Sequence, residues 1–404
     1  MLNNNPRQKG LDMYSTASVS DLRMGACGAV IDLTGLYGEL AKLRDKRQAR
    51  GKRYGLALVL LLVVLAKLCG EDRPYGIAQW LEGRASRLIA FLGLPCRCLP
   101  SHNTYRRVLG ECLEVKQLQR VVCRFLRGRS AGGGEVLISM DGKTLRGSLT
   151  PGGARVHILA AYMPTEGVVL AQVAVDSTEN ELSAAPHLLQ CLDLRGKVVV
   201  GDAIFTQRQL SVRIVRAGGE YIWLAKDNQP RLREAIVRLF LPQASTPGWG
   251  LPANDFQQTL THNKAHGRLE QRILTSSELL NAYLDWPHVA QVFRLERHRT
   301  HLRTGIHETE VVYGLTSLTR QEANPSQLLA LVRNYWGIEN GLYHRRDATL
   351  REDATRMTKP TFAQTMAVLN NLVIGLVLRA GWRYLPQARR YYDAHPEAAL
   401  NLLL

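Results

Sequence analysis

The alternation of apolar and polar positions divides the chain into a helical first part and a second part in which strands and helices alternate. From about residue 31 to residue 128, apolar side chains recur at helical spacing. This spacing predicts four helices, over Leu33–Leu43, Gly55–Ala66, Ile77–Leu94 and Ser101–Phe125. Ser101 precedes the last of them and is expected to cap it with its hydroxyl.

The run Gly55–Ala66 is apolar on every side but too short to cross a bilayer, which needs roughly 20 residues. It therefore predicts a buried helix of a small helical domain. The first residues of the chain lack the apolar core of a signal peptide. We accordingly expect a protein of the cytoplasm that associates with the nucleoid and not with a membrane.

After the flexible joint Gly132–Gly134, the hydrophobic period becomes that of strands. The predicted elements, in chain order, are the strands Val136–Met140, Val156–Met163 and Val168–Val175, the helix Glu179–Cys191, the strand Lys197–Val200, the helix Gln207–Ala217 and the strand Tyr221–Ala225. The order β-β-β-α-β-α-β is typical of a ribonuclease-H-like core. The predicted fold class is α/β, a ribonuclease-H-like mixed sheet with a β-rich insertion, preceded by a small all-helical domain.

These patterns predict the domain organisation. The expected parts are a flexible leader at 1–30, a helical DNA-binding domain at 31–130, a catalytic domain at 135–385 with an insertion at about 230–320, and a C-terminal tail at 386–404. A helix that begins at about Gln327 is expected to bring the chain back from the insertion to the core.

The charge of the chain indicates a polyanionic partner. It has 404 residues, with 52 Lys and Arg against 35 Asp and Glu and a net charge of +17. This surplus favours nucleic acid over a small acidic metabolite. Seven cysteines without regular spacing indicate reduced thiols, and the isolated pair Cys96 and Cys98 does not make a zinc site.

Three acidic residues are candidates for catalysis. Asp141 and Asp202 each follow an apolar run that predicts a strand, so each is expected at a strand end, and Glu339 lies in a basic helical segment. Three carboxylates from separate elements can hold two Mg²⁺ ions about 4 Å apart, with Mn²⁺ as a substitute, and such a pair activates an attacking oxygen and stabilises a leaving alkoxide. Asp347 and Glu352 are rival third acids.

Basic and aromatic side chains near these acids are candidates for DNA contacts. The candidate DNA-binding residues are Arg106, Arg107, Lys143, Arg146, Arg268, Arg333, Tyr335, Trp336, Arg345 and Arg346. Arg346 follows Glu339 by seven residues, about two turns of an α-helix, and is interpreted as a phosphate clamp. The alternative for each arginine is an ion pair, with Asp347, Glu352 and Asp353 within reach, and the alternative for Tyr335 and Trp336 is the core.

Two further motifs have plain structural interpretations. His266 could act as a general base, but two-metal chemistry needs none, so a structural or DNA-contacting role is preferred. Asn180 and Glu181 stand at a predicted helix start, where capping explains them.

Several motifs together resemble the DDE transposases of the ISAs family, the H-repeat-associated proteins. They are Asp141–Gly147, Gly201–Ala203 with Thr206 and Gln207, Leu224–Pro230, His266–Arg268, Tyr335–Asn340 and Arg351–Asp353, with Pro100–Leu109 resembling the signature of the helical domain that precedes the catalytic domain in that family. The resemblance runs from about residue 30 onward. It implies that Asp141, Asp202 and Glu339 form the metal-binding acidic triad. The chain departs from the family pattern at Asp227, where a Gly is common, and in the residues before Thr206.

We therefore expect a metal-dependent DNA transposase that cleaves strands at insertion-sequence ends and transfers them into target DNA, without a small-molecule substrate. Because two ends must be held together, a homodimer assembled on DNA is expected. The alternatives are a ribonuclease-H-like nuclease without strand transfer and a non-catalytic DNA-binding protein.

Overall fold

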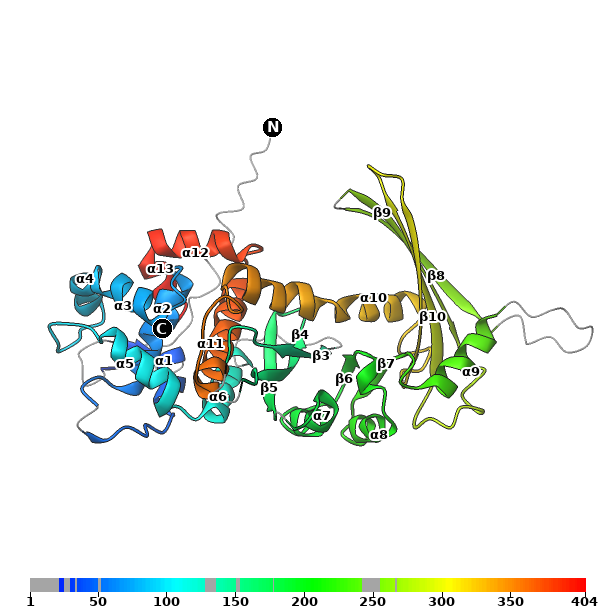
Figure 1. The fold of residues 1–404 in the computed structure, drawn as a ribbon, viewed down its shortest axis with the longest axis horizontal. Helices are drawn as coiled ribbons and strands as arrows, with labels where there is room; N and C mark the ends of the chain where they lie inside the picture. Colours follow the sequence, from blue (N-terminus) through cyan, green and yellow to red (C-terminus); the bar gives the residue numbers. More distant parts are fainter. Residues whose placement is uncertain are drawn as a thin grey trace, which may run out of the picture.

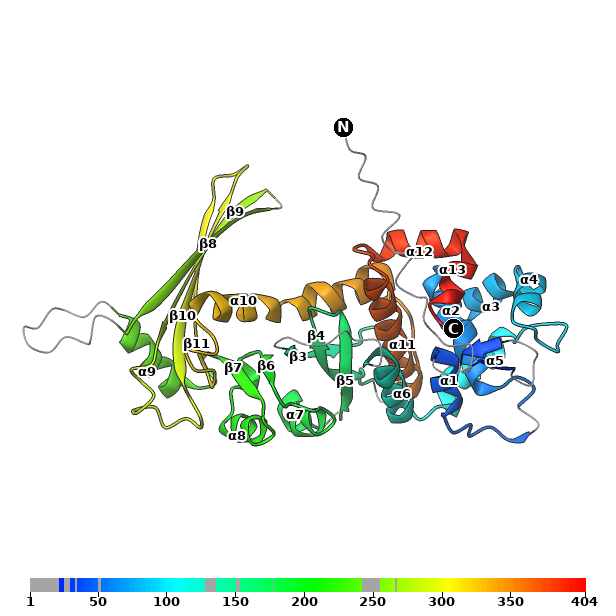
Figure 2. The same cartoon turned by 180° about the vertical axis from the view of Figure 1, so that it is seen from behind.

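The computed structural model describes residues 22–24, 30–32, 35–49, 52–127, 136–149, 153–176, 178–241, 255–265 and 267–404. The molecule is elongated, with a helical part at one end, a central sheet and a long β-ribbon at the other end (Figures 1 and 2). The predicted joint Gly132–Gly134, His266 and most of the predicted leader lie outside the described residues. Within that leader, the short strand β1 (Leu22–Met24) pairs with β2 (Val30–Asp32).

The predicted helical domain is confirmed as a region of short helices. They are α1 (Leu36–Ala41), α2 (Leu56–Leu68), α3 (Pro74–Glu82), α4 (Ala85–Phe91), α5 (His102–Arg107), the π-helical turn η3 (Val108–Cys112) and α6 (Val115–Arg127). Two of the four predicted helices are divided. Gly83 ends α3 before α4 begins, and Leu113 interrupts the last predicted helix with an extended backbone.

The predicted helix cap at Ser101 is wrong in detail. Ser101 is the N-cap residue of α5, but its side chain accepts no capping bond, and its hydroxyl lies 3.5 Å from that of Thr104. The two hydroxyls therefore face each other at the start of the helix.

The C-terminal residues, expected as a tail, instead form α12 (Leu385–Ala394) and α13 (Pro396–Asn401). Both return to the helical part, where Leu36 N donates to Leu403 O at 2.9 Å and Trp80 Nε1 donates to Asp393 Oδ1 at 2.7 Å. The helical part is thus built from both ends of the chain.

Between the helical part and the sheet lies α11 (Pro360–Arg379), which contacts α2, α6 and β5. In the described part of the chain, α11 is the one helix long and apolar enough to cross a membrane, and 78% of its most apolar stretch is buried inside the protein. Such burial is that of a core helix.

The rest of the molecule is built around a nine-stranded mixed sheet. Its strand order is β5-β4-β3-β6-β7-β11-β10-β9-β8. Its strands are β3 (Val136–Thr144), β4 (His157–Met163), β5 (Val168–Val175), β6 (Lys197–Gly201), β7 (Glu220–Ala225), β8 (Gln257–Ala265), β9 (Arg268–Ser277), β10 (Gln291–His301) and β11 (His307–Thr316). β3, β6 and β7 are parallel, and β4 is antiparallel to its neighbours β3 and β5. This is the arrangement of the ribonuclease-H-like fold, so the predicted fold class is confirmed.

Helices cover both faces of the central strands. On one face lie α7 (Glu181–Gln190) and α8 (Arg208–Arg216), and on the other lies α10 (Pro325–Tyr335), as Figure 1 shows. Neighbouring residues of a strand serve opposite faces, since Leu137 packs in the cluster of α10 while Ile138 packs in the larger core. Strands buried on both faces are apolar almost throughout, which explains their continuous hydrophobic runs.

The predicted insertion begins with α9 (Pro230–Phe240) and continues as the strands β8 to β11. β11 pairs with β7, for example Tyr313 with Ala225. The insertion therefore extends the central sheet, and its four strands continue beyond that sheet as a long ribbon.

Candidate active site

The three predicted carboxylates come from three elements that meet on the α10 side of the sheet. Asp141 lies inside β3, which continues to Thr144, so the prediction that it ends a strand is wrong. Asp202 follows β6 directly, as predicted. Glu339 begins the π-helical turn η5 (Glu339–Tyr343), a few residues after α10 ends. Because β3 and β6 are adjacent and parallel, their two acids lie at the same edge of the sheet.

The other carboxylates are near enough to Asp141 for their charges to act on it. The pKa of Asp141 is raised to about 7, mainly by burial and then by the negative charges of Glu181, Glu339 and Asp202. The pKa of the Tyr335 hydroxyl is raised by burial and by the same four carboxylates. Asp141 thus stands near several acidic side chains, of which Asp202 is paired with Lys226 and Glu181 with His157.

Glu181 is the acid that sequence reasoning missed, because a capping role seemed to explain it. Asn180 does cap α7, with its side chain accepting from Ser183 N at 3.0 Å. The carboxylate of Glu181 lies against Gly142, where a Cβ atom would be only 1.9 Å from Oε1. It also lies 2.8 Å from His157 Nε2. By strand alternation it reaches β3 from the α7 side, opposite to Asp141.

Two lysines lie beside the acids. Lys226 Nζ is 2.9 Å from Asp202 Oδ1, and both side chains are about half exposed. Lys226 was not predicted as a site residue, although its place directly after β7, in a motif quoted for the family resemblance, was an available signal. Lys143 is buried, 2.7 Å from Asp347, and its ammonium group lies over the ring of Tyr343.

Tyr343 ties the segment after Glu339 to β3. Its hydroxyl donates to the main-chain oxygen of Asp141 at 2.8 Å. Burial, followed by the charge of Asp141, raises the pKa of this hydroxyl. The hydrogen bond fixes η5 against the strand that carries Asp141.

The prediction that Arg346 clamps a phosphate is not supported by its position. Arg346 is fully buried and forms an ion pair of 2.7 Å with Glu352, which is buried as well. Its segment is π-helical, in η6 (Arg345–Thr349), so seven residues after Glu339 are not two turns along one face. The ion-pair alternative therefore describes Arg346, and it removes Glu352 as a rival third acid.

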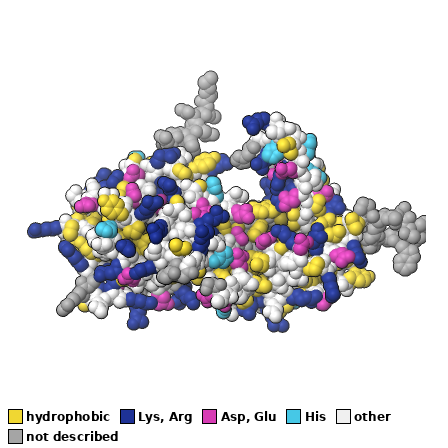
Figure 3. Space-filling model, viewed as in Figure 1, with side chains coloured by type: hydrophobic (Ala, Val, Ile, Leu, Met, Phe, Trp, Pro, Cys, Tyr) yellow, Lys and Arg dark blue, Asp and Glu magenta, His cyan; other side chains and the backbone are white. Residues whose placement is uncertain are grey.

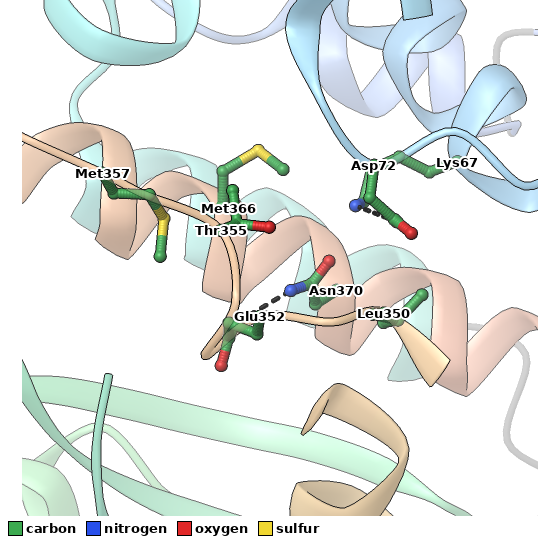
Figure 4. Close-up of a pocket in the computed structure, with 8 residues that line it drawn as sticks. All are labelled: Lys67, Asp72, Leu350, Glu352, Thr355, Met357, Met366 and Asn370. Carbon is green, nitrogen blue, oxygen red and sulfur yellow. Dashed lines mark hydrogen bonds and ion pairs between the residues drawn. The ribbon is translucent and has the colours of Figure 1, made fainter. Parts of the chain in front are cut away.

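Glu352 also lines a small polar pocket between the helical part and α11 (Figure 4). There Asn370 Nδ2 donates to Glu352 Oε1 at 2.7 Å, and Lys67 pairs with Asp72 at 2.9 Å. The residues that line it are Lys67, Asp72, Leu350, Glu352, Thr355, Met357, Met366 and Asn370. None of the three predicted carboxylates lines this pocket, so we interpret it as part of the packing between the two regions.

Of the two predicted aromatic contacts, one is inaccessible. Tyr335 is buried in the α10 cluster, which bears out the core alternative. Trp336 is half-buried, and the guanidinium of Arg297 lies 4.2 Å from its ring centroid.

The remaining predicted DNA contacts are scattered over the surface. Arg106 and Arg107 are exposed on α5 of the helical part, Arg333 is exposed on α10, and Arg268 is exposed on the ribbon. Arg146 is exposed beside Asp353, while Arg345 is half-buried and bonds to Gly341 O. Arg146 lies two residues after β3, and Arg333 lies on α10, the helix that precedes Glu339.

The carboxylates of the candidate site are suitable ligands for a metal ion, but their spacing in this structure is too wide to hold one. Among the described residues, no three His, Cys, Asp or Glu side chains are grouped closely enough to hold one. The mutual repulsion around Asp141 is nevertheless what a divalent cation would relieve, and carboxylate oxygens are the ligands that Mg²⁺ prefers. An ion would therefore have to draw these oxygens together.

Two known protein families match parts of the chain. The family described as "Transposase DDE domain" matches residues 132–376, which include all three predicted carboxylates. The chain belongs to the transposase DDE domain family. A second family, described as "DDE_Tnp_1-associated", matches residues 37–126, the helical part of this DDE protein.

Related proteins align with most of this chain. It is 24% identical to the "H repeat-associated putative transposase YhhI" of Escherichia coli K12, covering 87% of this chain and 94% of the relative. It is 31% identical to an uncharacterized protein in the dhlA 3′ region of Xanthobacter autotrophicus, covering 63% and 85%. The resemblance to the H-repeat-associated proteins is thereby confirmed.

Among solved structures, a piggyBac transposase synaptic complex with hairpin DNA aligns with a TM-score of 0.43 and 10% identity, covering 91% of this chain and 77% of that one. The fold assignment above depends on the strand order and not on this likeness.

Proposed function

We propose that the protein is a DNA transposase that cleaves strands at the ends of an insertion sequence and joins the freed 3′-hydroxyls to target DNA. The observation that supports this most is that Asp141 and Asp202 come directly after the paired residues Met140 and Gly201 of the adjacent strands β3 and β6, with Glu339 near enough to raise the pKa of Asp141, in a chain of the DDE family. The surplus of basic residues, with a net charge of +17, suits a DNA substrate.

Asp141, Asp202 and Glu339 would hold divalent metal ions, Mg²⁺ or Mn²⁺, two in each site. When bound, such ions supply activation of the attacking oxygen and neutralisation of the charge that develops on the phosphodiester and the leaving oxygen. The carboxyl group of Asp141, whose pKa is about 7, must be ionised to serve as a ligand. The affinity for the ions is therefore expected to rise with pH through neutrality.

The basic side chains would position the DNA. Lys226 pairs with Asp202, and it would be available to a phosphate if an ion took its place beside that carboxylate. Arg146 is exposed two residues after β3 and can bind a phosphate of the DNA. Lys143 is buried and paired with Asp347, so we assign it to holding the segment after Glu339 and not to DNA.

The direct test uses purified full-length protein, a labelled duplex carrying a candidate element end, a supercoiled target plasmid, and Mg²⁺ or Mn²⁺. Mapping the termini should reveal 3′-hydroxyls at the element end and joint molecules with the plasmid. Nicking without joint molecules would favour a nuclease without strand transfer. Binding to the end without any metal-dependent reaction would favour a non-catalytic DNA-binding protein.

Transposition of an element requires two ends to be held together, so we propose a homodimer assembled on DNA. Light scattering with and without end DNA should show the mass of two protomers when the duplex is present. A complex of one protomer with one duplex under cleaving conditions would contradict it.

A further inference from the structure

The end of the β-ribbon projects from the molecule. Val312 of β11 packs against the apolar cluster of α10, and Ile306, the residue before β11, lies six residues from it along the chain, which at about 3.3 Å per residue is roughly 20 Å. The two hairpins of the ribbon end side by side, where Leu302 N donates to Gly267 O at 2.9 Å. Figures 1 and 2 show the ribbon rising from one end of α10 and bending back above that helix. We call the exposed residues at this end the ribbon tip, namely Lys264, Arg268, Leu269, Leu302, Arg303 and Ile306.

The ribbon tip exposes aliphatic side chains. Leu269 is 42% exposed, Leu302 is 50% exposed and Ile306 is 56% exposed. They stand at hairpin ends, which polar residues and glycine usually occupy. In Figure 3 the protrusion carries apolar, basic and histidine side chains toward its end, with acidic side chains below them. Exposed apolar groups gathered at the end of a long projection indicate a surface that contacts a partner.

The ribbon tip is also basic, which favours a negatively charged partner. Neither 267–269 nor 301–307 contains an acidic residue. Lys264, Arg268 and Arg303 form no ion pair with any residue that the structure describes. Closer to the core the pattern is the opposite, since Arg272 pairs with Glu270 and Arg297 pairs with Glu310. Uncompensated cations on the ribbon are thus concentrated at its tip.

On the basis of the DNA-processing function proposed above, we propose that the ribbon tip is a further DNA-binding site that grips a duplex where its base stacking is disturbed. Arg268, Arg303 and Lys264 bind phosphates, while Leu302 and Ile306 lie against the faces of unstacked bases. Proteins that bend or open a duplex combine these two kinds of side chain in the same way, with aliphatic wedges between base steps and cations on the backbone.

A second copy of the chain suits the tip less well. In a two-fold contact the same surface meets itself, so three unpaired cations would face three others. DNA supplies the opposite charge and the apolar base faces together. The lean of the ribbon above α10, the helix that precedes Glu339, also places the tip on the side of the sheet where the carboxylates lie.

The test uses the full chain and two 30-base-pair duplexes of one sequence, one fully paired and one with a two-nucleotide bulge. Dissociation constants are measured by fluorescence anisotropy at several salt concentrations. Two double variants separate the components, Leu302→Ser with Ile306→Ser and Arg268→Ala with Arg303→Ala. The matched control is Tyr283→Ser, because Tyr283 is 84% exposed in the connection at the opposite end of β9 and β10.

The unmodified protein and the control should bind the bulged duplex about tenfold more tightly than the paired one. The aliphatic variant should lose this preference and retain its affinity for the paired duplex. The arginine variant should bind both duplexes more weakly, with a salt dependence smaller by about two phosphate contacts. Circular dichroism melting should be unchanged in all variants, since the tip lies outside the core.

Variants that bind both duplexes as the unmodified protein does would overturn the proposal. So would an unmodified protein without preference for the bulge, or tip variants that change only the mass in light scattering, which would identify a contact between copies. Metal-dependent cleavage of an element end that persists alongside any of these results would leave the proposed function standing. If the aliphatic variant loses the bulge preference that the unmodified protein shows, and the unmodified protein never cleaves DNA, the result would support the ribbon tip as a DNA-binding site and contradict the proposed transposase function.

Discussion

At the scale of single residues, Asp141 is the most perturbed group of the candidate site. It lies inside a strand, and its pKa is raised to about 7 by burial and then by the charges of three other carboxylates. A carboxyl group in this setting binds its proton more tightly in the folded chain than in the unfolded chain. Its protonation therefore favours the folded state.

The sign of the resulting pH dependence follows from linkage. The stabilisation from protonated Asp141 is complete below about pH 4 and is lost as the pH rises through about 7. In the absence of divalent ions, Asp141→Asn should therefore melt higher than the unmodified protein at pH 8, by about 2 °C or more, with little difference at pH 4.

Thermal melting from pH 4 to pH 8.5 measures this effect. The control is Asp227→Asn, which alters an exposed acid after β7. Mg²⁺ at pH 8 should raise the melting temperature of the unmodified protein but not that of Asp141→Asn. Parallel melting curves of the two proteins at every pH would contradict the environment described for Asp141.

Arg346 leads to the second prediction. Because Arg346 and Glu352 are both buried, Arg346→Met should leave a buried carboxylate without its cation and lower the free energy of unfolding by about 3–5 kcal/mol. The double change Arg346→Met with Glu352→Leu should recover most of that loss. Chemical denaturation measures both.

The contrasting variant is Arg146→Met, at a side chain that is 76% exposed. It should weaken DNA binding and leave the stability almost unchanged. If Arg346→Met instead kept full stability and lost DNA affinity, Arg346 would be the phosphate clamp that its spacing from Glu339 suggested.

At the scale of elements, the short segment after β3 contacts the segment before α11, and this contact joins distant parts of the site. Ser148 bridges to Met357, and Met357 N donates to Gly147 O at 2.8 Å. Arg146 N donates to Asp353 Oδ1 at 3.0 Å. These contacts bind the end of the Asp141 strand to the segment that follows Glu339.

Gly147 is required for that contact. A Cβ atom there would stand 2.2 Å from the main-chain oxygen of Thr355, which cannot move like the end of a side chain. Gly147→Ala should lower the free energy of unfolding by about 1–3 kcal/mol and reduce cleavage of DNA. Gly55→Ala is the control, since nothing lies within 4 Å of the position of its Cβ. Equal stability of the two variants would contradict the close contact.

Regular elements could be predicted from the sequence, and irregular ones could not. The strand Val168–Val175 has the predicted bounds, and the helices α7 and α8 lie within one or two residues of prediction. Asp141 and Asp202 were predicted as site residues because each follows a strong apolar run, and Glu339 because of its place in the motif Tyr335–Asn340. The π-helical turns after Glu339 depend on tertiary contacts such as Tyr343 with Asp141, and these leave no periodic signal.

At the scale of the whole molecule, long-range packing decides what the sequence pattern left open. Two helices of the expected tail close the helical part, through contacts such as Leu36 with Leu403. The insertion extends the central sheet because β11 pairs with β7. Glu181 could not be recognised as a neighbour of Asp141, since its capping context at α7 was sufficient to explain it locally.

The central claim is that Asp141, Asp202 and Glu339 together catalyse metal-dependent cleavage of DNA. The most direct measurement compares strand cleavage by Asp141→Asn, Asp202→Asn and Glu339→Gln with that by Asp347→Asn, in Mg²⁺ and in Mn²⁺, with DNA binding measured in parallel. Each triad variant should bind DNA and lose cleavage by at least about a hundredfold, while Asp347→Asn should retain most of it. Cleavage that survives in any triad variant, or that is lost in Asp347→Asn and retained in Glu339→Gln, would contradict this assignment.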